Sequence, residues 1–314
     1  MLSCKEQAER IEETVLQPFD KWVDQLQETC EEQPCIWWMF CLNKLFCWLL
    51  WVVVKVVEWV AIIVVRWVYR TVCTVVMIIV GIIALVTGNT DILVTALKDV
   101  WQLIKDGFYA GTGLIIFIAL RIVDWVQTLI GVQARKRPLT EIEKAVLRPI
   151  YHDSLNYAAI RVVDGKAGIL TGSGRAFTMG FTIYLPVNSL STVVHESVHV
   201  WQFQFGGFGY IGNSAFNQLD SMVFNKGYDP YDWRPRMNQS VSWYNLGSAE
   251  AQAKFIEDVY GGGSFTTADL ELPTTDRSPG AFFREDVPGT NQFVDAGTDY
   301  TAQANAAWRI LRTG

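Results

Sequence analysis

Residues 193–202 read Val-Val-His-Glu-Ser-Val-His-Val-Trp-Gln and carry two histidines, His195 and His199, four positions apart. Side chains four positions apart project from the same face of an α-helix, so both imidazoles can reach one ion. The flanking valines favour a helix that is buried in a folded domain. The stretch therefore predicts a helix built around a metal site, and a pair of structural histidines on a buried helix is the alternative explanation.

Glu196 lies one position after the first histidine, about 100° further around the helix. From there its carboxylate can reach a water on the metal rather than the metal itself. Zinc lowers the pKa of a bound water and polarises a substrate carbonyl. A carboxylate beside that water can accept its proton and pass it to the leaving group, so Glu196 is the expected general base.

A catalytic zinc needs a third protein ligand. Residues 248–258 predict a second helix, and Glu250 on this helix is the best candidate for that ligand. Glu257 or Asp258 can orient a ligating imidazole from behind. His152 is the only histidine outside the pair at 195 and 199.

A donor for the oxyanion that develops next to the metal is also expected, and a tyrosine or histidine commonly supplies it. The sequence offers several such side chains without choosing among them: Tyr184, Tyr244, Tyr260 and His152.

Around the histidine pair the sequence predicts an α+β arrangement. The expected elements are a helix at Thr140–Val146 ended by Arg148-Pro149, strands at Ile160–Val163 and Phe181–Leu185, a metal-binding helix capped by Ser191 or Thr192 and closed by Gly206-Gly207, and a last helix at Thr301–Arg312. The strand at Phe181–Leu185 is expected at a sheet edge. Residues 261–297, rich in Gly, Thr and Pro, are expected to be irregular.

The N-terminal part of the chain is strongly apolar. Half of the 314 residues are hydrophobic and 18% are charged, against roughly a quarter charged in ordinary soluble domains. The excess lies at 36–132, which predicts a helical, membrane-associated region with candidate spans at Leu45–Val65, Thr71–Thr87 and Gly111–Ile130. Residues 1–35 predict an amphipathic helix that precedes this region.

Charges within the apolar region follow a helical stripe. Lys44, Lys55 and Arg66 are spaced by eleven residues, close to three helical turns, and Glu58 and Arg70 lie near the same line. Intramembrane charges usually face a partner or water. The stripe can therefore line a bundle interior or a pore, or the helices can lie at the membrane interface or be shielded by a carrier.

Cysteines and net charge narrow the class of protein further. All six cysteines precede residue 74, so we expect free thiols among apolar side chains rather than a disulfide scaffold. The net charge of -6 argues against a nucleic-acid partner.

The basic segment at 133–138 reads as the domain boundary and places a domain of residues 133–314 after the apolar region. A Lys/Arg cluster directly after an apolar helix tends to stay on the cytoplasmic side, where we expect this domain.

The run at 193–202 resembles the signature of gluzincin-type zinc metallopeptidases. It is more similar to a peptidase domain found near bacterial contractile injection systems, and the similarity covers about Leu139 to Tyr260. The resemblance implies a zincin-like fold that holds Zn²⁺, with His195, His199 and Glu250 as ligands. Lys254 departs from the gluzincin pattern, because many members carry an aspartate four residues after the glutamate.

Together these features predict a membrane-associated zinc hydrolase that acts on a peptide or protein. The resemblance implies an injected bacterial effector or toxin, delivered into a target cell by a secretion-apparatus carrier or chaperone. A pore-forming or membrane-disrupting protein, with the zincin-like domain structural or serving delivery, is the alternative. An integral-membrane housekeeping peptidase is a third, weakened because the histidine motif lies outside the apolar segments.

Overall fold

The computed structural model describes residues 25, 29, 47, 50, 51, 53–55, 73, 91–129, 131–165, 167–171, 174–225, 227–268, 272–285 and 288–314. The chain divides into two compact units, Met1–Phe108 and Tyr109–Gly314, and the latter is called the second unit below. Several predictions fall mainly on residues outside the described ones: the helix at 1–35 and the spans at 45–65 and 71–87. The same holds for four residues of the charged stripe, Lys44, Glu58, Arg66 and Arg70.

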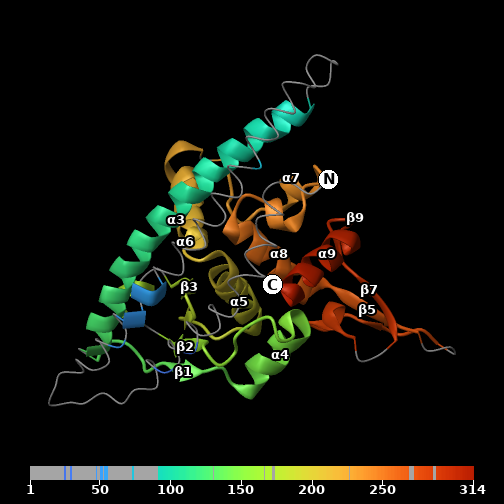
Figure 1. The fold of residues 1–314 in the computed structure, drawn as a ribbon. Helices are drawn as coiled ribbons and strands as arrows, with labels where there is room; N and C mark the ends of the chain where they lie inside the picture. The colour runs from blue at the N-terminus through green and yellow to red at the C-terminus, as the bar shows by residue number, and fades with distance from the viewer. Residues whose placement is uncertain are drawn as a thin grey trace. The chain divides into compact units, whose positions relative to one another are not determined.

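The described part is mixed α+β (Figure 1). Its helices are α3 (Asp91–Leu129), α4 (Glu141–Tyr151), α5 (Leu190–Gly206), α6 (Gly209–Leu219), α7 (Arg234–Met237), α8 (Ala249–Gly262) and α9 (Thr301–Thr313), with shorter turns η2 (Gly168–Thr171), η3 (Asp220–Phe224), η4 (Trp243–Asn245) and η5 (Ala281–Phe283). Its strands are β1 (Arg137–Pro138), β2 (Arg161–Asp164), β3 (Phe177–Met179), β4 (Thr182–Leu185), β5 (Ser264–Thr267), β6 (Thr275–Asp276), β7 (Gly289–Gln292), β8 (Val294–Asp295) and β9 (Thr298–Asp299).

A four-stranded sheet with the order β1-β2-β4-β3 supports one side of the second unit. β2 and β4 are parallel, with Val162 opposite Ile183, and β1 and β3 pair antiparallel at the two edges. The strand before α5, β4, is therefore internal, and the prediction that it lies at the edge was wrong. Gly180, at φ +64°, makes the tight turn that folds β3 back over the free side of β4.

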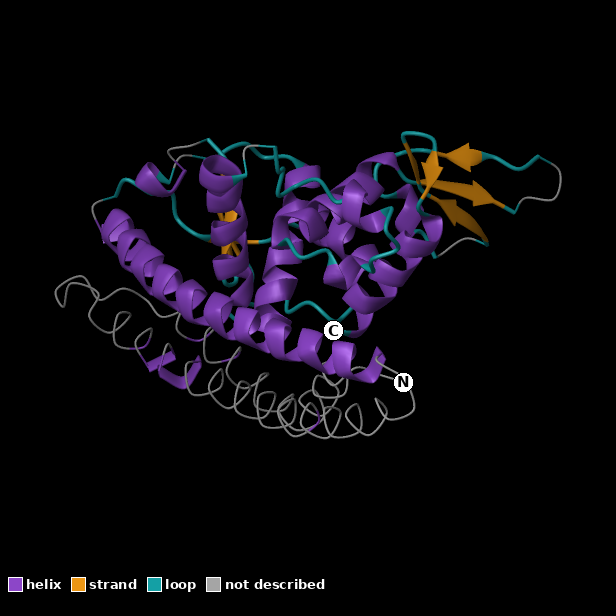
Figure 2. Cartoon of the chain, turned by 90° about the horizontal axis from the view of Figure 1, so that it is seen from above, coloured by secondary structure: helices purple, strands orange, loops and turns teal. Residues whose placement is uncertain are grey.

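A second sheet, of β5, β6 and β7, corrects the prediction of irregular structure at 261–297. Helices separate the two sheets (Figure 2). Thr266 pairs with Thr275 on one side and with Thr290 on the other. The paired residues are thus up to 24 positions apart in the sequence. Such short polar strands give little periodic signal in a single sequence.

Helix α4 continues past Pro149, although the sequence predicts an end there. Proline removes one backbone hydrogen bond of the helix, and its ring crowds the carbonyl four residues earlier. The carbonyl of Pro149 accepts hydrogen bonds from Trp308 Nε1 (2.9 Å) and from Arg312 (2.8 Å), which anchor the turn to α9. The predicted last helix, α9, is present at Thr301–Thr313.

Helix α5 begins after Ser189 rather than at the predicted Ser191 or Thr192, and the Ser189 side chain makes no capping hydrogen bond. Its end is as predicted, at Gly206, with Gly207 in a positive-φ conformation. Helix α8 is capped by Ser248, whose hydroxyl accepts from the Ala251 N–H. Both helices are deeply buried and pack against each other.

Helix α3 contains Ile104–Thr128, a segment long and apolar enough to cross a membrane by length and composition. It includes residues 111–128 of the predicted span at Gly111–Ile130, yet the C-terminal half of α3 belongs to the second unit. Phe117 packs on Phe203 and Phe208, with ring centroids 5.9 and 4.9 Å away. The compact unit thus begins at Tyr109, whereas the sequence places the boundary after residue 132.

The described cysteines, Cys47 and Cys73, are both disulfide-bonded. The prediction of free thiols was wrong for these two. Their positions in the sequence do not reveal which thiols the fold brings within the roughly 5.5–6 Å Cα separation that a disulfide requires.

Candidate metal centre

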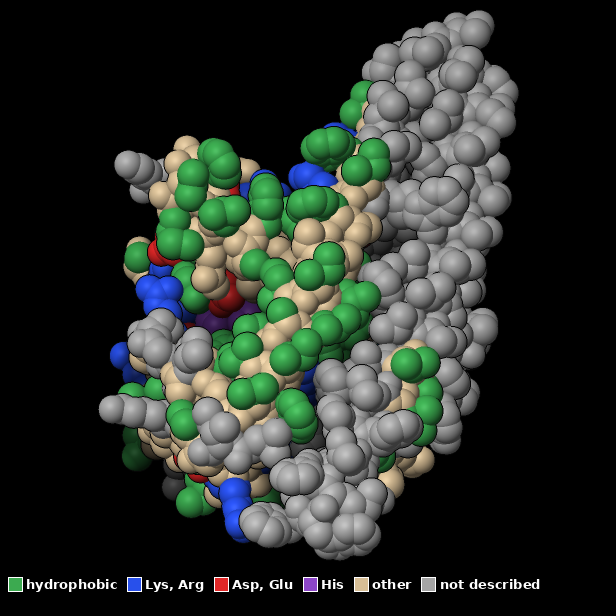
Figure 3. Space-filling view, turned by 90° about the vertical axis from the view of Figure 1, so that its left-hand side faces the viewer, with side chains coloured by type: hydrophobic (Ala, Val, Ile, Leu, Met, Phe, Trp, Pro, Cys, Tyr) green, Lys and Arg blue, Asp and Glu red, His purple; other side chains and the backbone are tan. Residues whose placement is uncertain are grey.

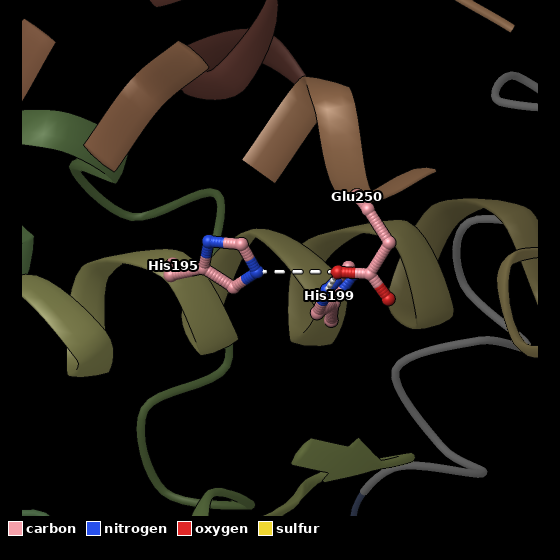
Figure 4. Close-up of side chains that lie close together, drawn as sticks. All are labelled: His195, His199 and Glu250. Atoms are coloured by element: carbon pink, nitrogen blue, oxygen red, sulfur yellow. Dashed lines mark hydrogen bonds and ion pairs between the residues drawn. The ribbon is translucent and has the colours of Figure 1, made fainter. Parts of the chain in front are cut away.

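Three buried side chains converge where α5 faces α8 (Figure 4). His195 and His199 come from consecutive turns of α5, and Glu250 comes from the first turn of α8. Glu250 Oε2 lies 3.3 Å from His195 Nε2 and 3.2 Å from His199 Nε2. All three potential ligand atoms lie within 4.8 Å of one another, so they can hold one metal ion.

The spacing of these atoms fits a small tetrahedral ion. Ligand atoms about 2.1 Å from a tetrahedral zinc lie about 3.4 Å from each other, close to the two distances that involve Glu250. Two imidazoles and one carboxylate also form a donor set that leaves a fourth position open. Among the described residues, no fourth His, Cys, Asp or Glu joins this group.

The outer nitrogens of both imidazoles have their own partners. His195 Nδ1 lies 3.1 Å from Glu257 Oε2, and His199 Nδ1 lies 2.7 Å from Gln202 Oε1. An Nδ1–H that donates to these oxygens leaves the Nε2 lone pair free for a metal. Glu257 was predicted for this role, whereas Gln202 was missed although it follows His199 by three residues.

Gln202 also joins α5 to the helix of the third ligand. Its Nε2 donates to Gln252 Oε1 (2.6 Å) and to the carbonyl of Ala249 (3.3 Å). Gln252 in turn donates to the carbonyl of Tyr244 (2.8 Å). The amide therefore fixes His199 and the first turn of α8 at once.

Asp258, the other predicted orienting acid, bonds elsewhere. It accepts from Trp233 Nε1 (2.9 Å) and from Lys254 Nζ (2.8 Å). Lys254 also pairs with Glu257 at 3.3 Å. The carboxylate that contacts His195 Nδ1 is thus Glu257, seven residues after Glu250. Lys254, four residues after Glu250, forms an ion pair with this carboxylate.

Electrostatics bind the cluster together even without a metal. Burial disfavours the charged imidazole of His195, but hydrogen bonds to Glu250 and Glu257 outweigh it and raise the pKa to about 10. Burial also opposes ionisation of Glu250, yet the two imidazoles hold the pKa of this carboxyl well below its usual value. Gln218 of α6 donates to Glu250 Oε1 at 3.3 Å, which leaves Oε2 facing the imidazoles.

Glu196 is held against the sheet beside the cluster. The hydroxyl of Thr178, on β3, lies 2.9 Å from Glu196 Oε2 and 3.0 Å from its carbonyl oxygen. Burial raises the pKa of Glu196 and outweighs the opposing charges of His195 and His199. The Glu196 carboxyl is therefore a buried acid directly beside the two imidazoles.

Two tyrosines that the sequence did not select flank the imidazoles. Tyr210 stacks on His199 at 5.6 Å, but its hydroxyl donates to the Thr178 carbonyl and accepts from Gly180 N–H. Tyr231 lies with its ring 6.1 Å from that of His195. Burial, with the charge of Glu250, raises the pKa of Tyr231, so its hydroxyl stays protonated and can donate. It stands in an aromatic-rich loop whose sequence gives no pattern.

The remaining predicted side chains are not brought to the cluster. His152 follows α4, is half exposed and pairs with Glu285 at 3.2 Å. Tyr260 lies near the end of α8, where its carbonyl accepts from the Gly280 N–H. Tyr184 donates its hydroxyl to Asp124 on α3 at 2.6 Å. Tyr244 contributes its backbone carbonyl to Gln252.

Comparison with the models of known protein families, with curated proteins and with solved structures finds no match to this chain. The case for a function therefore rests on the residues and their geometry.

Proposed function

We propose that the chain is a zinc-dependent hydrolase with a zincin-like second unit, and that it cleaves peptide bonds. The observation that supports this most strongly is the buried convergence of His195, His199 and Glu250 beside the carboxylate of Glu196. If the two histidines only packed in the core, a third potential ligand at about tetrahedral spacing would have no explanation. The buried carboxylate of Glu196 beside them would have none either.

The side chains divide the work as follows. A bound zinc ion would supply Lewis acidity towards a carbonyl and a water. Glu196, anchored by Thr178, accepts the proton of the attacking water and returns it to the leaving amine, which completes the hydrolysis of an amide into acid and amine. Tyr231 donates its hydroxyl to the oxygen that becomes negative in the transition state.

This proposal has three further parts: the metal is zinc, the substrate is a peptide or protein, and the protein acts at a membrane. Zinc is favoured by the two-imidazole, one-carboxylate donor set. A setting as an injected effector or toxin, with a carrier that shields the apolar region, follows from the sequence resemblance and the apolar composition of residues 36–132.

The proposal is tested by metal content and hydrolysis together. The full chain, purified in mild detergent, should hold about one zinc per chain, as expected of a single mononuclear site. His199→Ala should lose the metal, whereas Glu196→Gln should keep it and lose cleavage of a fluorogenic peptide mixture by about 100-fold or more. His152→Ala is the matched control and should keep both. Wild-type protein that binds no zinc would overturn the assignment.

A membrane-disrupting activity is the second candidate, favoured by the exposed apolar side chains of α3 at Ile115 and Ile122. Vesicle leakage separates it from hydrolysis. Dye release that persists undiminished in Glu196→Gln would assign disruption to the apolar region, and dye release that disappears with the substitution would tie it to the metal site.

A further inference from the structure

Exposed apolar side chains gather on one short stretch of the second unit. Five of them lie within nine consecutive residues on α6 and η3, and this group is called the α6–η3 patch: Phe216, Leu219, Met222, Val223 and Phe224. Met222 is 67% exposed and Phe224 is 74% exposed. Elsewhere in the described part of the second unit beyond α3, exposed large apolar residues occur at scattered positions, as on ordinary protein surfaces.

Helix α3 adds a second apolar strip to this face. Ile115, Ile122 and Val126 are 70%, 52% and 41% exposed, and their spacing of seven and four places them along one side of the helix. The opposite side carries Arg121 and Asp124, both buried against the second unit. From Ile115 to Val126, α3 therefore presents its apolar side outward, while Arg121 and Asp124 are buried in the protein.

The two apolar areas are held together by close helix packing. A Cβ on Gly212 of α6 would lie 2.1 Å from the Tyr109 carbonyl of α3, and one on Gly113 would lie 1.9 Å from the Phe208 carbonyl. The rings of Tyr109 and Phe216 are 5.8 Å apart. Such contacts tolerate little relative movement, so the patch and residues 109–129 of α3 keep fixed positions relative to each other.

The metal site opens on the same face. Figure 3 shows apolar side chains along α3 and over α6 and η3, and between them a hollow that holds histidine and acidic side chains. α6 contacts the cluster directly, through Gln218 on Glu250 and Tyr210 on His199. Whatever covers the apolar face therefore lies beside the entrance to the site.

The scarcity of charged residues on this apolar face favours lipid as the partner that covers it. A face that meets water, or an acidic or basic protein, would carry more charges. From Gly209 to Asn225, the stretch that contains α6 and η3, the chain has a single Asp, Glu, Lys or Arg, which is Asp220. The other polar side chains there are Tyr210 and several Asn, Gln and Ser residues, which can form hydrogen bonds in the headgroup region of a bilayer. Arg121 donates to the Met179 carbonyl and Asp124 accepts from Tyr184, so a crossing of the membrane by this half of α3 would draw the folded unit into the bilayer.

We propose that this face, formed by the α6–η3 patch and the exposed side of α3 from Ile115 to Val126, rests on the surface of a lipid bilayer. α3 then lies along the interface with its apolar side in the lipid, in the manner of an amphipathic monotopic helix. The metal site opens at the membrane surface, where it meets the membrane-proximal segments of its substrates. The last step rests on the proposed hydrolase function, whereas the lipid contact does not.

The test measures depth in the membrane and needs no catalysis. The full chain is reconstituted in phosphatidylcholine vesicles with a fluorescent amino acid at position 222, 115 or 142. Ile142 on α4 is the control, because it is apolar and 68% exposed but lies outside the proposed face. A nitroxide attached to the lipid chains should quench the probes at 222 and 115 several-fold more than the probe at 142, and aqueous iodide should show the reverse order.

Every other pattern overturns the proposal. Iodide quenching at 222 equal to that at 142 would leave the patch in water. A probe at 222 shielded from both quenchers would mean that protein covers it, either another part of this chain or a second copy. Lipid quenching at 115 alone would place α3 in the membrane without the metal site. The same measurement in Glu196→Gln should be unchanged, which separates this result from any failure of the hydrolase assignment.

Discussion

At the residue scale, the side chains behind the two imidazoles would decide how well the proposed site holds an ion. Glu257 fixes the ring of His195 through Nδ1, while Asp258, the next residue, is engaged by Trp233 and Lys254. Removal of such an outer partner typically weakens metal binding by about 10- to 100-fold. We expect a loss of this size for Glu257→Ala in a chelator competition measurement of zinc affinity.

Asp258→Ala provides the matched control. It removes a carboxylate from the same turn of α8, so it changes local charge equally, but it leaves His195 with its partner. We expect its zinc affinity to stay near that of the wild type while its melting temperature falls. Equal losses of affinity in the two variants would mean that charge near the site matters and the contact to His195 does not.

The three side chains that converge in the candidate site were predicted from the sequence, but few of the groups that orient them were. His195 and His199 are recognisable because a single helix fixes their spacing, and Glu250 because the helix around it is strongly patterned. Thr178, Gln202 and Gln218 were not predicted, since their contacts depend on how β3, α5 and α6 approach the site. Hydrogen-bond partners from different elements leave no spacing rule in one chain.

At the scale of elements, glycine decides how closely α3 and α6 approach. Gly113 faces the backbone of Phe208, whereas Gly111, two residues earlier on the same helix, has nothing within 4 Å of an added Cβ. Gly113→Ala forces a clash with backbone that cannot rotate away, and overpacking of this kind costs about 1–3 kcal/mol. Gly111→Ala should instead stabilise the helix by up to about 1 kcal/mol.

Thermal unfolding of the two variants beside the wild type measures this difference. The sign of the effect is the critical result, because both substitutions add the same methyl group to the same helix. If Gly113→Ala melts at or above the wild-type temperature, then α3 and α6 are not in close contact.

The N-terminus of α4 supplies a pH-dependent contribution to stability. Glu143 completes a capping box with Thr140, and both of its oxygens accept hydrogen bonds from Arg137 at 2.8 Å. Burial opposes ionisation, but the Arg137 hydrogen bond outweighs it and lowers the pKa of Glu143 below its usual value of 4.5. The stabilisation is therefore fully present above about pH 4.5 and is lost as the pH falls through the lowered pKa.

Glu143→Gln should accordingly destabilise the protein by about 2 kcal/mol at neutral pH, the range for hydrogen bonds to charged groups. The difference from the wild type should shrink in acid below the lowered pKa, where the native carboxyl is itself protonated. Urea unfolding at both pH values checks this. Glu141→Gln is the control, since its carboxylate is exposed and pairs with Lys144 at 3.0 Å. A difference independent of pH would contradict the assignment.

The elements that the sequence predicted are those with a strong local period. α5, α8 and α9 fall close to their expected limits because their apolar residues recur at helical spacing. β3 and the sheet of β5 to β7 escaped prediction, because two- to four-residue strands are defined by their partners and not by their own pattern. The predicted end of α4 at Pro149 was wrong for a related reason. Trp308 and Arg312 of α9 hold the last turn of α4 in place, and these contacts are not visible in the local sequence.

At the scale of the whole molecule, composition and packing divide the chain at different places. Apolar composition changes near residue 132, but the second compact unit begins at Tyr109. The two boundaries differ because both sides of α3 are apolar but only one is buried. The exposed side adds to the apolar composition, while Phe117 on the buried side packs on Phe203 in the core of the second unit. A hydropathy profile averages over both sides of a helix and cannot separate these two uses.

This division predicts how two fragments behave. A fragment of residues 109–314 keeps Phe117 against Phe203 and Phe208, and keeps Asp124 as the acceptor of the Tyr184 hydroxyl. A fragment of residues 133–314 uncovers the rings of Phe203 and Phe208 and leaves the buried Tyr184 hydroxyl without its acceptor, which alone costs about 1–3 kcal/mol. We expect the longer fragment to unfold cooperatively in mild detergent and to bind zinc.

The shorter fragment should bind a hydrophobic dye, aggregate and bind zinc weakly, because the surface beneath α5 is open. Phe117→Ala in the longer fragment tests the same contact without a change of length and should cost about 3–5 kcal/mol. If residues 133–314 alone matched the longer fragment in melting temperature and zinc affinity, α3 would be an attached membrane segment rather than part of the folded unit. In that case the basic segment at 133–138 would be the true start of the domain, as its sequence first indicated.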